Sequence, residues 1–152
     1  MSEHLARVHW QRNGAVFTDQ RYSRAHRWQF DGGADIAAAA SPGVVPAALT
    51  DASAVDPEEA FVAAISSCHM LWFLSLAAAA GICIDSYVDE AVGHMRKVDG
   101  RMAIAEVVLR PRIVCSGGAA DSERLHELHE AAHDRCFIAH SVRCAIRIET
   151  PA

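Results

Sequence analysis

The sequence lacks the clustered positive charge that a nucleic-acid partner requires. Its formal net charge is -5, and the 14 lysine and arginine residues are spread along the chain without forming a basic run. A protein that binds a duplex neutralises the phosphates with clustered basic side chains. We therefore expect no nucleic-acid partner.

An unbroken apolar segment is also missing. The longest apolar run, residues 60–80, is interrupted by Ser66, Ser67, His69 and Ser75. This run predicts a buried helix, so we expect no membrane partner. Residues 1–14 contain histidine, arginine and glutamine where a signal peptide needs a continuous apolar stretch. We therefore expect a cytoplasmic protein.

The cysteine count does not fit a disulfide scaffold. Five is an odd number, and the chain of 152 residues is neither short nor rich in loops, so structural disulfides are not expected in a reducing compartment. Any important cysteine should therefore act chemically. Hydrophobic residues make up 51% and charged residues 22% of the chain. This balance is typical of a soluble globular protein, and the length predicts a single domain over residues 1–152.

Alternating apolar and polar residues predict strands in six segments: residues 5–11, 22–30, 34–40, 86–97, 101–114 and 143–149. The first three form an N-terminal β-meander, with a turn at Asp31-Gly32-Gly33. The next two form a β-hairpin, because Val98-Asp99-Gly100 between them contains the Asp-Gly hairpin signal. The last segment closes the chain as a strand. Prolines among small residues predict a loop over residues 41–55.

Two helices are expected between these strands. The first should run from Pro57 to Ala80, with Asp56 as its N-cap and Gly81 as its stop. Almost every face of this helix is apolar, so it should be buried on several sides. One domain of this size would hardly enclose it, which favours a homodimer that shares the helix as its core. The second helix should begin near Asp121 and end at about Cys136.

Two cysteines are candidates for a reactive pair. Cys68 lies in the middle of the buried helix, and Cys136 ends the second helix. A buried thiol is ordinarily an inert small apolar group. Attack on a peroxide needs a thiolate beside a cation, and a second thiol to capture the resulting sulfenic acid. Two cysteines on two different helices could provide such a pair.

A second pattern suggests a metal site. His129 and Glu130, followed by His133, match the H-E-x-x-H motif of zinc proteases. The motif places two imidazoles one turn apart, with a glutamate available as general base. A third ligand would have to come from His140 or Glu149, at spacings that match no common protease. A zinc-dependent hydrolase is therefore the alternative function. For a function based on the cysteine pair, no metal or other cofactor is expected.

Several motifs together resemble the OsmC/Ohr family, and they span nearly the whole chain in the same order and spacing. They are Tyr22-Ser23-Arg24-Ala25-His26, Phe30-Asp31-Gly32-Gly33, Ser41-Pro42, Asp56-Pro57-Glu58-Glu59, Ser66-Ser67-Cys68-His69 and Cys136-Phe137-Ile138-Ala139. The resemblance implies an α+β fold with the meander, central helix, hairpin, second helix and final strand described above. It also implies an intertwined homodimer with its active sites at the interface.

The resemblance further implies a thiol peroxidase that reduces organic hydroperoxides, with hydrogen peroxide as a secondary candidate substrate, in defence against oxidative stress. Cys68 would be the attacking thiol and Cys136 the resolving one. Arg24, or alternatively Arg21, would steady the thiolate and be held by Glu58. An external dithiol, such as a lipoylated protein, would reduce the disulfide. Side chains such as Phe61 and Met70 should favour apolar peroxides.

The spacing between Glu58 and Cys68 sets a geometric test. Ten residues of helix rise about 15 Å, so the two side chains of one chain cannot meet along a continuous helix. Either the helix bends or starts later, or the partner subunit supplies the glutamate.

The chain departs from the family at His140 and has extra cysteines at Cys83, Cys115 and Cys144, which we expect to serve packing. A dimeric member without catalysis is a further alternative.

Overall fold

The computed structural model describes residues 2–116 and 121–150. The described chain forms two compact units, Met1–Ala60 and Phe61–Ala152. The assignment of all 152 residues to one domain stays a prediction. The mixed α+β class expected from the sequence is confirmed by the order of strands and helices.

The first unit contains the predicted β-meander. Strands β1 (Ala6–His9), β2 (His26–Phe30) and β3 (Asp35–Ala38) form an antiparallel sheet in that order. The turn between β2 and β3 closes with a hydrogen bond from Gly33 N to Phe30 O of 3.0 Å. Gly33 has φ +90°, a value that a residue with a side chain rarely adopts. The predicted loop that follows contains one short helix, η1 (Ala47–Leu49).

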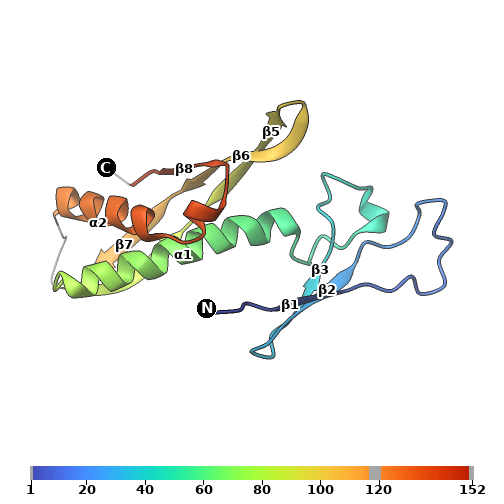
Figure 1. Cartoon of the computed structure of the whole chain (residues 1–152), viewed down its shortest axis with the longest axis horizontal. Coiled ribbons are helices and arrows are strands. Elements are labelled where there is room, and N and C mark those ends of the chain that lie inside the picture. The colour runs from blue at the N-terminus through green and yellow to red at the C-terminus, as the bar shows by residue number, and fades with distance from the viewer. Residues whose placement is uncertain (1, 117–120, 151–152) are drawn as a thin grey trace. The chain divides into compact units, whose positions relative to one another are not determined.

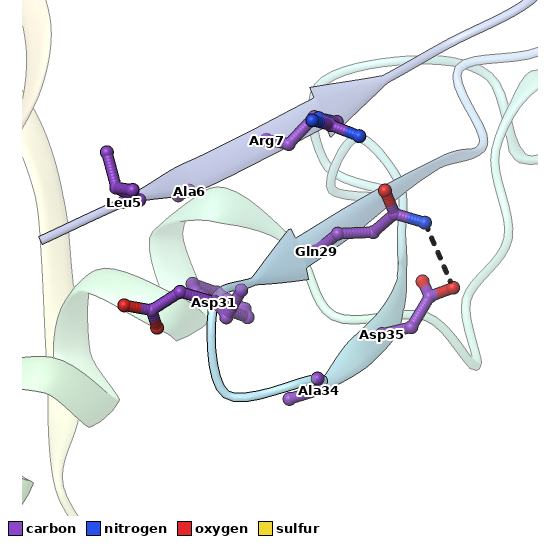
Figure 2. Close-up of a pocket in the computed structure, with 9 residues that line it drawn as sticks. Leu5, Ala6, Arg7, Gln29, Asp31, Ala34 and Asp35 are labelled. Carbon is purple, nitrogen blue, oxygen red and sulfur yellow. Dashed lines mark hydrogen bonds between the residues drawn. The ribbon is translucent and has the colours of Figure 1, made fainter.

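A cavity of about 530 Å³ lies against this sheet. Figure 2 shows Gln29 on β2 and Asp35 on β3 reaching toward one another, and Gln29 Nε2 donates to Asp35 Oδ2 at 3.3 Å. Asp35 also pairs with the Arg27 guanidinium at 2.7 Å. The hydrogen bond from Arg27, followed by that from Gln29, lowers the pKa of the Asp35 carboxyl.

The predicted ends of the central helix are confirmed. Helix α1 (Pro57–Ala79) begins with a capping box in which Glu59 N donates to Asp56 Oδ1 at 2.8 Å and Asp56 N donates to Glu59 Oε2 at 3.1 Å. It ends at Ala79, one residue before the predicted Ala80; Gly81, the predicted stop, has φ +75°, and Ile82 N donates back to Ala77 O at 2.9 Å. Reciprocal N-capping and a left-handed glycine are the local signals that delimit helices.

The burial of α1 differs from the expectation. Its fully buried residues recur every fourth position, at Ile65, His69, Phe73 and Ala77, so a single chain covers one stripe of the helix. Leu71 is 61% exposed. By length and composition α1 could cross a membrane. In the structure it packs on α2 and β6 as the core helix of the second unit.

The second unit contains two sheets where the sequence predicted one hairpin of two long strands. Strands β4 (Ile84–Asp89) and β7 (Pro111–Cys115) form one sheet, and β5 (Val92–Val98), β6 (Arg101–Leu109) and β8 (Ala145–Ile148) form the other. The predicted hairpin is confirmed between β5 and β6, where Asp99 and Gly100 both have positive φ.

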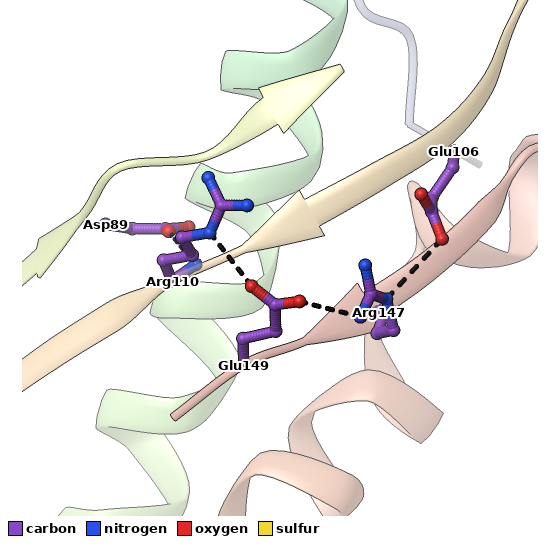
Figure 3. Close-up of polar contacts among 5 residues, drawn as sticks. All are labelled: Asp89, Glu106, Arg110, Arg147 and Glu149. Carbon is purple, nitrogen blue, oxygen red and sulfur yellow. Dashed lines mark hydrogen bonds and ion pairs between the residues drawn. The ribbon is translucent and has the colours of Figure 1, made fainter. Parts of the chain in front are cut away.

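Each predicted long strand is divided in two because the chain passes from one sheet to the other. It does so between β4 and β5 and again between β6 and β7. The Asp89 side chain accepts from Arg110 N at 2.6 Å, which takes this N–H out of the strand ladder. Pro111 follows and has no N–H to donate. Figure 3 shows Asp89 beside Arg110 at this change of sheet.

Ion pairs join β8 to β6 near the same point. Glu149 lies between Arg110, at 2.9 Å, and Arg147, at 2.6 Å, and Arg147 also approaches Glu106 at 3.5 Å (Figure 3). The hydrogen bond from Arg110 lowers the pKa of Glu149. The partners are partly exposed to solvent, which screens their charges, so these pairs contribute little to stability.

Helix α2 (Ser122–Arg135) lies beside α1, as Figure 1 shows in orange and green. Its N-cap is Asp121, whose side chain accepts from Glu123 N. The two helices bury Phe73 and Ala77 of α1 against Leu128 and Ala132 of α2. A short helix, η2 (Ala139–Ser141), follows. The packing of α1 on α2 brings the two halves of the candidate site together.

Candidate active site

Cys68 and Cys136 lie in contact where the two helices meet. Cys68 is half-buried in the middle of α1, and Cys136 caps the C-terminal end of α2 with 1% of its surface exposed. Both are free thiols, and a hydrogen bond joins their side chains. The structure thus brings together two residues that are 68 positions apart in sequence.

The environment of Cys136 keeps its sulfur protonated. Burial, followed by the hydrogen bond with the Cys68 thiol, raises the pKa of Cys136 to about 11. Ala139 N donates to its Sγ at 3.4 Å, which acts in the opposite direction but is the smaller effect. At neutral pH, Cys136 is therefore a neutral thiol beside a more accessible one.

Arg24 belongs to the first unit and precedes β2. Its guanidinium donates to the carbonyl oxygens of Gln20, at 2.7 Å, and Tyr22, and it lies 4.0 Å above the centre of the Tyr22 ring. Its backbone N–H donates to Leu49 O at 2.8 Å. Arg21, the alternative, is exposed. Arg24 is thus the arginine that the fold holds in a defined orientation.

An aromatic cluster that the sequence did not suggest supports Arg24. Phe17 stacks on Tyr22 with ring centres 4.7 Å apart, and Trp10 meets Tyr22 edge-on at 5.3 Å. The three rings come from positions without a common spacing, so no periodic pattern could have revealed them.

Glu58 and Glu59 have different roles at the start of α1. Glu59 forms the capping box, and Glu58 is half-buried without taking part in the cap. The helix is continuous from Pro57 to Ala79, so it does not start later than Glu58. Among the described residues, the ion pairs do not include one between Arg24 and Glu58. Their action on the Cys68 thiolate stays a prediction.

The histidines of the H-E-x-x-H motif do not form a metal site in the described chain. His129 is 1% exposed, and its Nδ1 lies 3.0 Å from Nε2 of His69 on α1. Glu130 is exposed and His133 is half-buried. No three potential ligands converge anywhere in residues 2–116 and 121–150. The geometry therefore does not favour the zinc hydrolase alternative.

A second cavity, of about 910 Å³, lies in the second unit. Phe61, which we expected beside an apolar substrate, lines it together with Ile104, Val142 and Cys144, and Met70 does not. Burial raises the pKa of Cys144. The remaining extra cysteines lie near one another, since Cys83 O accepts from Ser116 N, next to Cys115.

Comparison with protein families gives a match to the model of the OsmC-like proteins over residues 50–151. The chain belongs to the OsmC-like family. An OsmC-like protein of unknown function from Vibrio cholerae is 50% identical, with a TM-score of 0.95, and the match covers 99% of this chain and 100% of that one. No curated protein matches the chain.

More distant OsmC-like structures share the fold. An organic hydroperoxide resistance protein from Legionella pneumophila has a TM-score of 0.72 at 15% identity, over 100% of this chain and 98% of that one. The organic hydroperoxide resistance protein OhrB of Bacillus subtilis has a TM-score of 0.68 at 22% identity, over 99% and 98%. These likenesses confirm the OsmC/Ohr fold expected from the motifs.

Proposed function

We propose that this OsmC-like protein is a thiol peroxidase that reduces organic hydroperoxides with Cys68 and Cys136. The observation that carries the proposal is the contact between an accessible thiol and a buried, protonated thiol on two packed helices. Two solved relatives of the same fold are named for organic hydroperoxide resistance. Hydroperoxide consumption is therefore the first activity to test.

In the first step, the Cys68 thiolate attacks one oxygen of the hydroperoxide. The O–O bond breaks, the sulfur gains OH as a sulfenic acid, and the departing alkoxide takes a proton to leave as an alcohol. Arg24, held by Tyr22 and by two carbonyls, would stabilise the thiolate and the charge that develops on oxygen. Glu58 would hold this guanidinium, from its own chain or from the partner subunit.

In the second step, the Cys136 thiol condenses with the sulfenic acid. An S–S bond forms, and the sulfenic OH leaves as water with the proton of Cys136. The raised pKa of Cys136 suits this role, because a protonated resolving thiol does not compete for the peroxide. An external dithiol, such as a lipoylated protein, then reduces the disulfide and is itself oxidised to a disulfide.

The exposed apolar side of α1 supports a homodimer. Leu71 is 61% exposed and Phe137, which packs edge-on against Trp72, is 70% exposed. Such side chains beside the reactive thiol suit either a second copy of the chain or an apolar substrate. We place the protein in the cytoplasm, where the external dithiol would keep both cysteines reduced.

Thiol titration tests the proposed function directly. One equivalent of cumene hydroperoxide should remove two free thiols per chain, and mass spectrometry should find Cys68 linked to Cys136. A variant in which Cys83, Cys115 and Cys144 are serine is the matched control and should lose the same two thiols. An unchanged thiol count in the folded protein would show that it is an inert member of the family.

A further inference from the structure

The core between α1 and α2 contains a pair of histidines that are hydrogen-bonded to each other edge to edge. His69 and His129 are each 1% exposed, their rings are 5.3 Å apart and within 7° of parallel, and Nε2 of His69 lies 3.0 Å from Nδ1 of His129. Phe73 stacks on the His129 ring with ring centres 4.3 Å apart. The pair is thus enclosed by aromatic and aliphatic side chains.

Stability alone does not account for this pair. The remaining ring nitrogens, Nδ1 of His69 and Nε2 of His129, are buried without a hydrogen-bond partner among the described residues. Whichever ring donates in the shared hydrogen bond, one N–H and one lone pair are left over. Leaving a buried polar group unpaired costs more free energy than one shared hydrogen bond returns. Apolar side chains of the same size would stabilise the core more.

Burial keeps both imidazoles neutral. It lowers the pKa of each to about 4, His133 acts in the same direction on His69, and Asp89 acts in the opposite one. On His129 the further causes are His69 and His126. A neutral pair makes a directional contact without introducing a charge between the helices.

The histidines occupy the same two helices as the cysteines. His69 follows Cys68 on α1, and His129 precedes Cys136 by two turns on α2. Apolar contacts between helices tolerate small shifts, whereas a hydrogen bond of 3.0 Å between two buried rings permits one axial alignment. Any slide of α1 along α2 that broke this bond would also separate the two sulfurs.

We propose that His69 and His129 are positioning residues that fix the register of α1 on α2 and so hold the Cys68 and Cys136 thiols within reach of one another. The inference deepens the proposed function, since it concerns the step in which the two sulfurs join. Neither histidine takes part in the attack on the peroxide.

Matched substitutions separate the hydrogen bond from the packing. Asn places a polar group where Nδ1 of His129 lies, and Leu has the same shape without it, so His129→Asn and His129→Leu form one pair. Gln and Met form the corresponding pair at His69, where Nε2 is the bonded atom. All variants are made in the background with serine at Cys83, Cys115 and Cys144, because Cys83 and Cys115 are near neighbours.

The first readout is the division between the two chemical steps. The first step should be unaffected in the His69→Met, His129→Leu double variant. Sulfenic acid should form at Cys68 at close to the parent rate, as measured by dimedone labelling. Closure of the disulfide after one equivalent of cumene hydroperoxide should slow by about tenfold or more, because a small misplacement of reacting atoms costs at least that much. The His69→Gln, His129→Asn variant should recover most of the loss.

The second readout does not depend on peroxide chemistry. Phenylarsine oxide bridges two neighbouring thiols, so it should bind the parent tightly through Cys68 and Cys136 and the Met/Leu double variant about tenfold more weakly. A parent that binds phenylarsine oxide but consumes no peroxide would overturn the proposed function, and weaker binding by the Met/Leu double variant would then still support the positioning role. A folded Met/Leu variant that closes its disulfide and binds phenylarsine oxide like the parent would overturn the positioning role.

Urea unfolding guards against a trivial result. Replacing a buried polar pair by apolar residues of similar volume is commonly neutral or stabilising, so the Met/Leu double variant should unfold at the same urea concentration as the parent or higher. Loss of thiol pairing in a stable protein supports the positioning role. The positioning role would be contradicted if thiol pairing were recovered neither in the His69→Gln, His129→Asn double variant nor in the His129→Asn single variant.

Discussion

The cysteine pair and the histidine pair connect the same two helices in different ways. The sulfurs meet where Cys68 is half-buried, so a substrate can approach one of them. The imidazoles meet where each ring is 1% exposed, so neither solvent nor substrate approaches them. The comparison separates a contact that can change covalently from one that only orients the helices.

Removing one of the two sulfurs should have the largest effect, and that effect should be on peroxide consumption. Cys68→Ser should abolish peroxide consumption, because the attacking atom is gone, while the thermal unfolding midpoint stays nearly unchanged. Cys136→Ser should still react once and accumulate sulfenic acid, which dimedone labelling followed by mass spectrometry would detect. Multiple turnovers by Cys68→Ser, measured with a dithiol reductant, would refute the assignment, and Cys144→Ser is the matched control.

Acid should act on the histidine pair and not on the cysteines. The pKa of each imidazole falls from 6.5 in the unfolded chain to about 4 in the folded one, so the unfolded state binds more protons in this interval. Stability from the neutral pair is complete above pH 6.5 and is lost as the pH falls toward 4. The free energy of unfolding should decrease by about 1.4 kcal/mol per pH unit for each imidazole.

Urea unfolding over this pH interval measures the effect. The variant with Gln at His69 and Asn at His129 should have a shallower dependence than the parent, since neither amide titrates. His9→Gln, on the exposed strand β1, is the control and should keep the parent slope. Equal slopes in all three proteins would contradict neutral burial of the pair.

The raised pKa of Cys136 predicts slow alkylation. A shift from 9.0 to about 11 reduces the thiolate fraction near neutral pH by about 100-fold. With serine at the other four cysteines, iodoacetamide should still modify Cys136 more than about tenfold more slowly than a small thiol of ordinary pKa, because burial, the largest cause of the raised pKa, remains. Rapid modification in the folded protein would indicate that Cys136 is not the protonated, buried partner. Urea should restore the ordinary rate.

Removing the ring that stacks on His129 should have the smallest effect. Phe73→Leu keeps an apolar side chain but loses the contact at 4.3 Å, and the free energy of unfolding should fall by about 1–1.5 kcal/mol. The thiol contact should persist, because the histidine hydrogen bond remains. A large loss of disulfide closure with little loss of stability would assign the positioning role to Phe73.

Local signals predicted the helices well and the strands less well. Asp56, Pro57 and Gly81 delimit α1 through interactions within a few residues, so their meaning does not depend on the rest of the fold. The long strands predicted at 86–97 and 101–114 are each divided between two sheets. That division depends on Asp89 meeting Arg110, a contact between residues 21 positions apart.

The candidate site was predictable where chemistry alone selects residues. A reactive pair can be proposed from two cysteines on two helices, whereas the attacking and resolving roles of Cys68 and Cys136 come from the resemblance to the family; the contact of the two residues agrees with a reactive pair. The histidine pair could not be found this way, because no chemistry of its own marks His69 and His129 as partners and only the packing of α1 on α2 brings them together. The H-E-x-x-H spacing suggested zinc, since sequence cannot reveal that His129 faces another helix and not a metal ion.

Asp89 links the topology of the second unit to its reactive helix. One carboxylate oxygen takes the main-chain N–H of Arg110 where the chain leaves one sheet for the other, and the second takes the hydroxyl of Ser66, two residues before Cys68. An amide at this position could accept from only one of these donors at a time. A single side chain therefore sets both the path of the backbone between the two sheets and the rotation of the cysteine-bearing helix about its own axis.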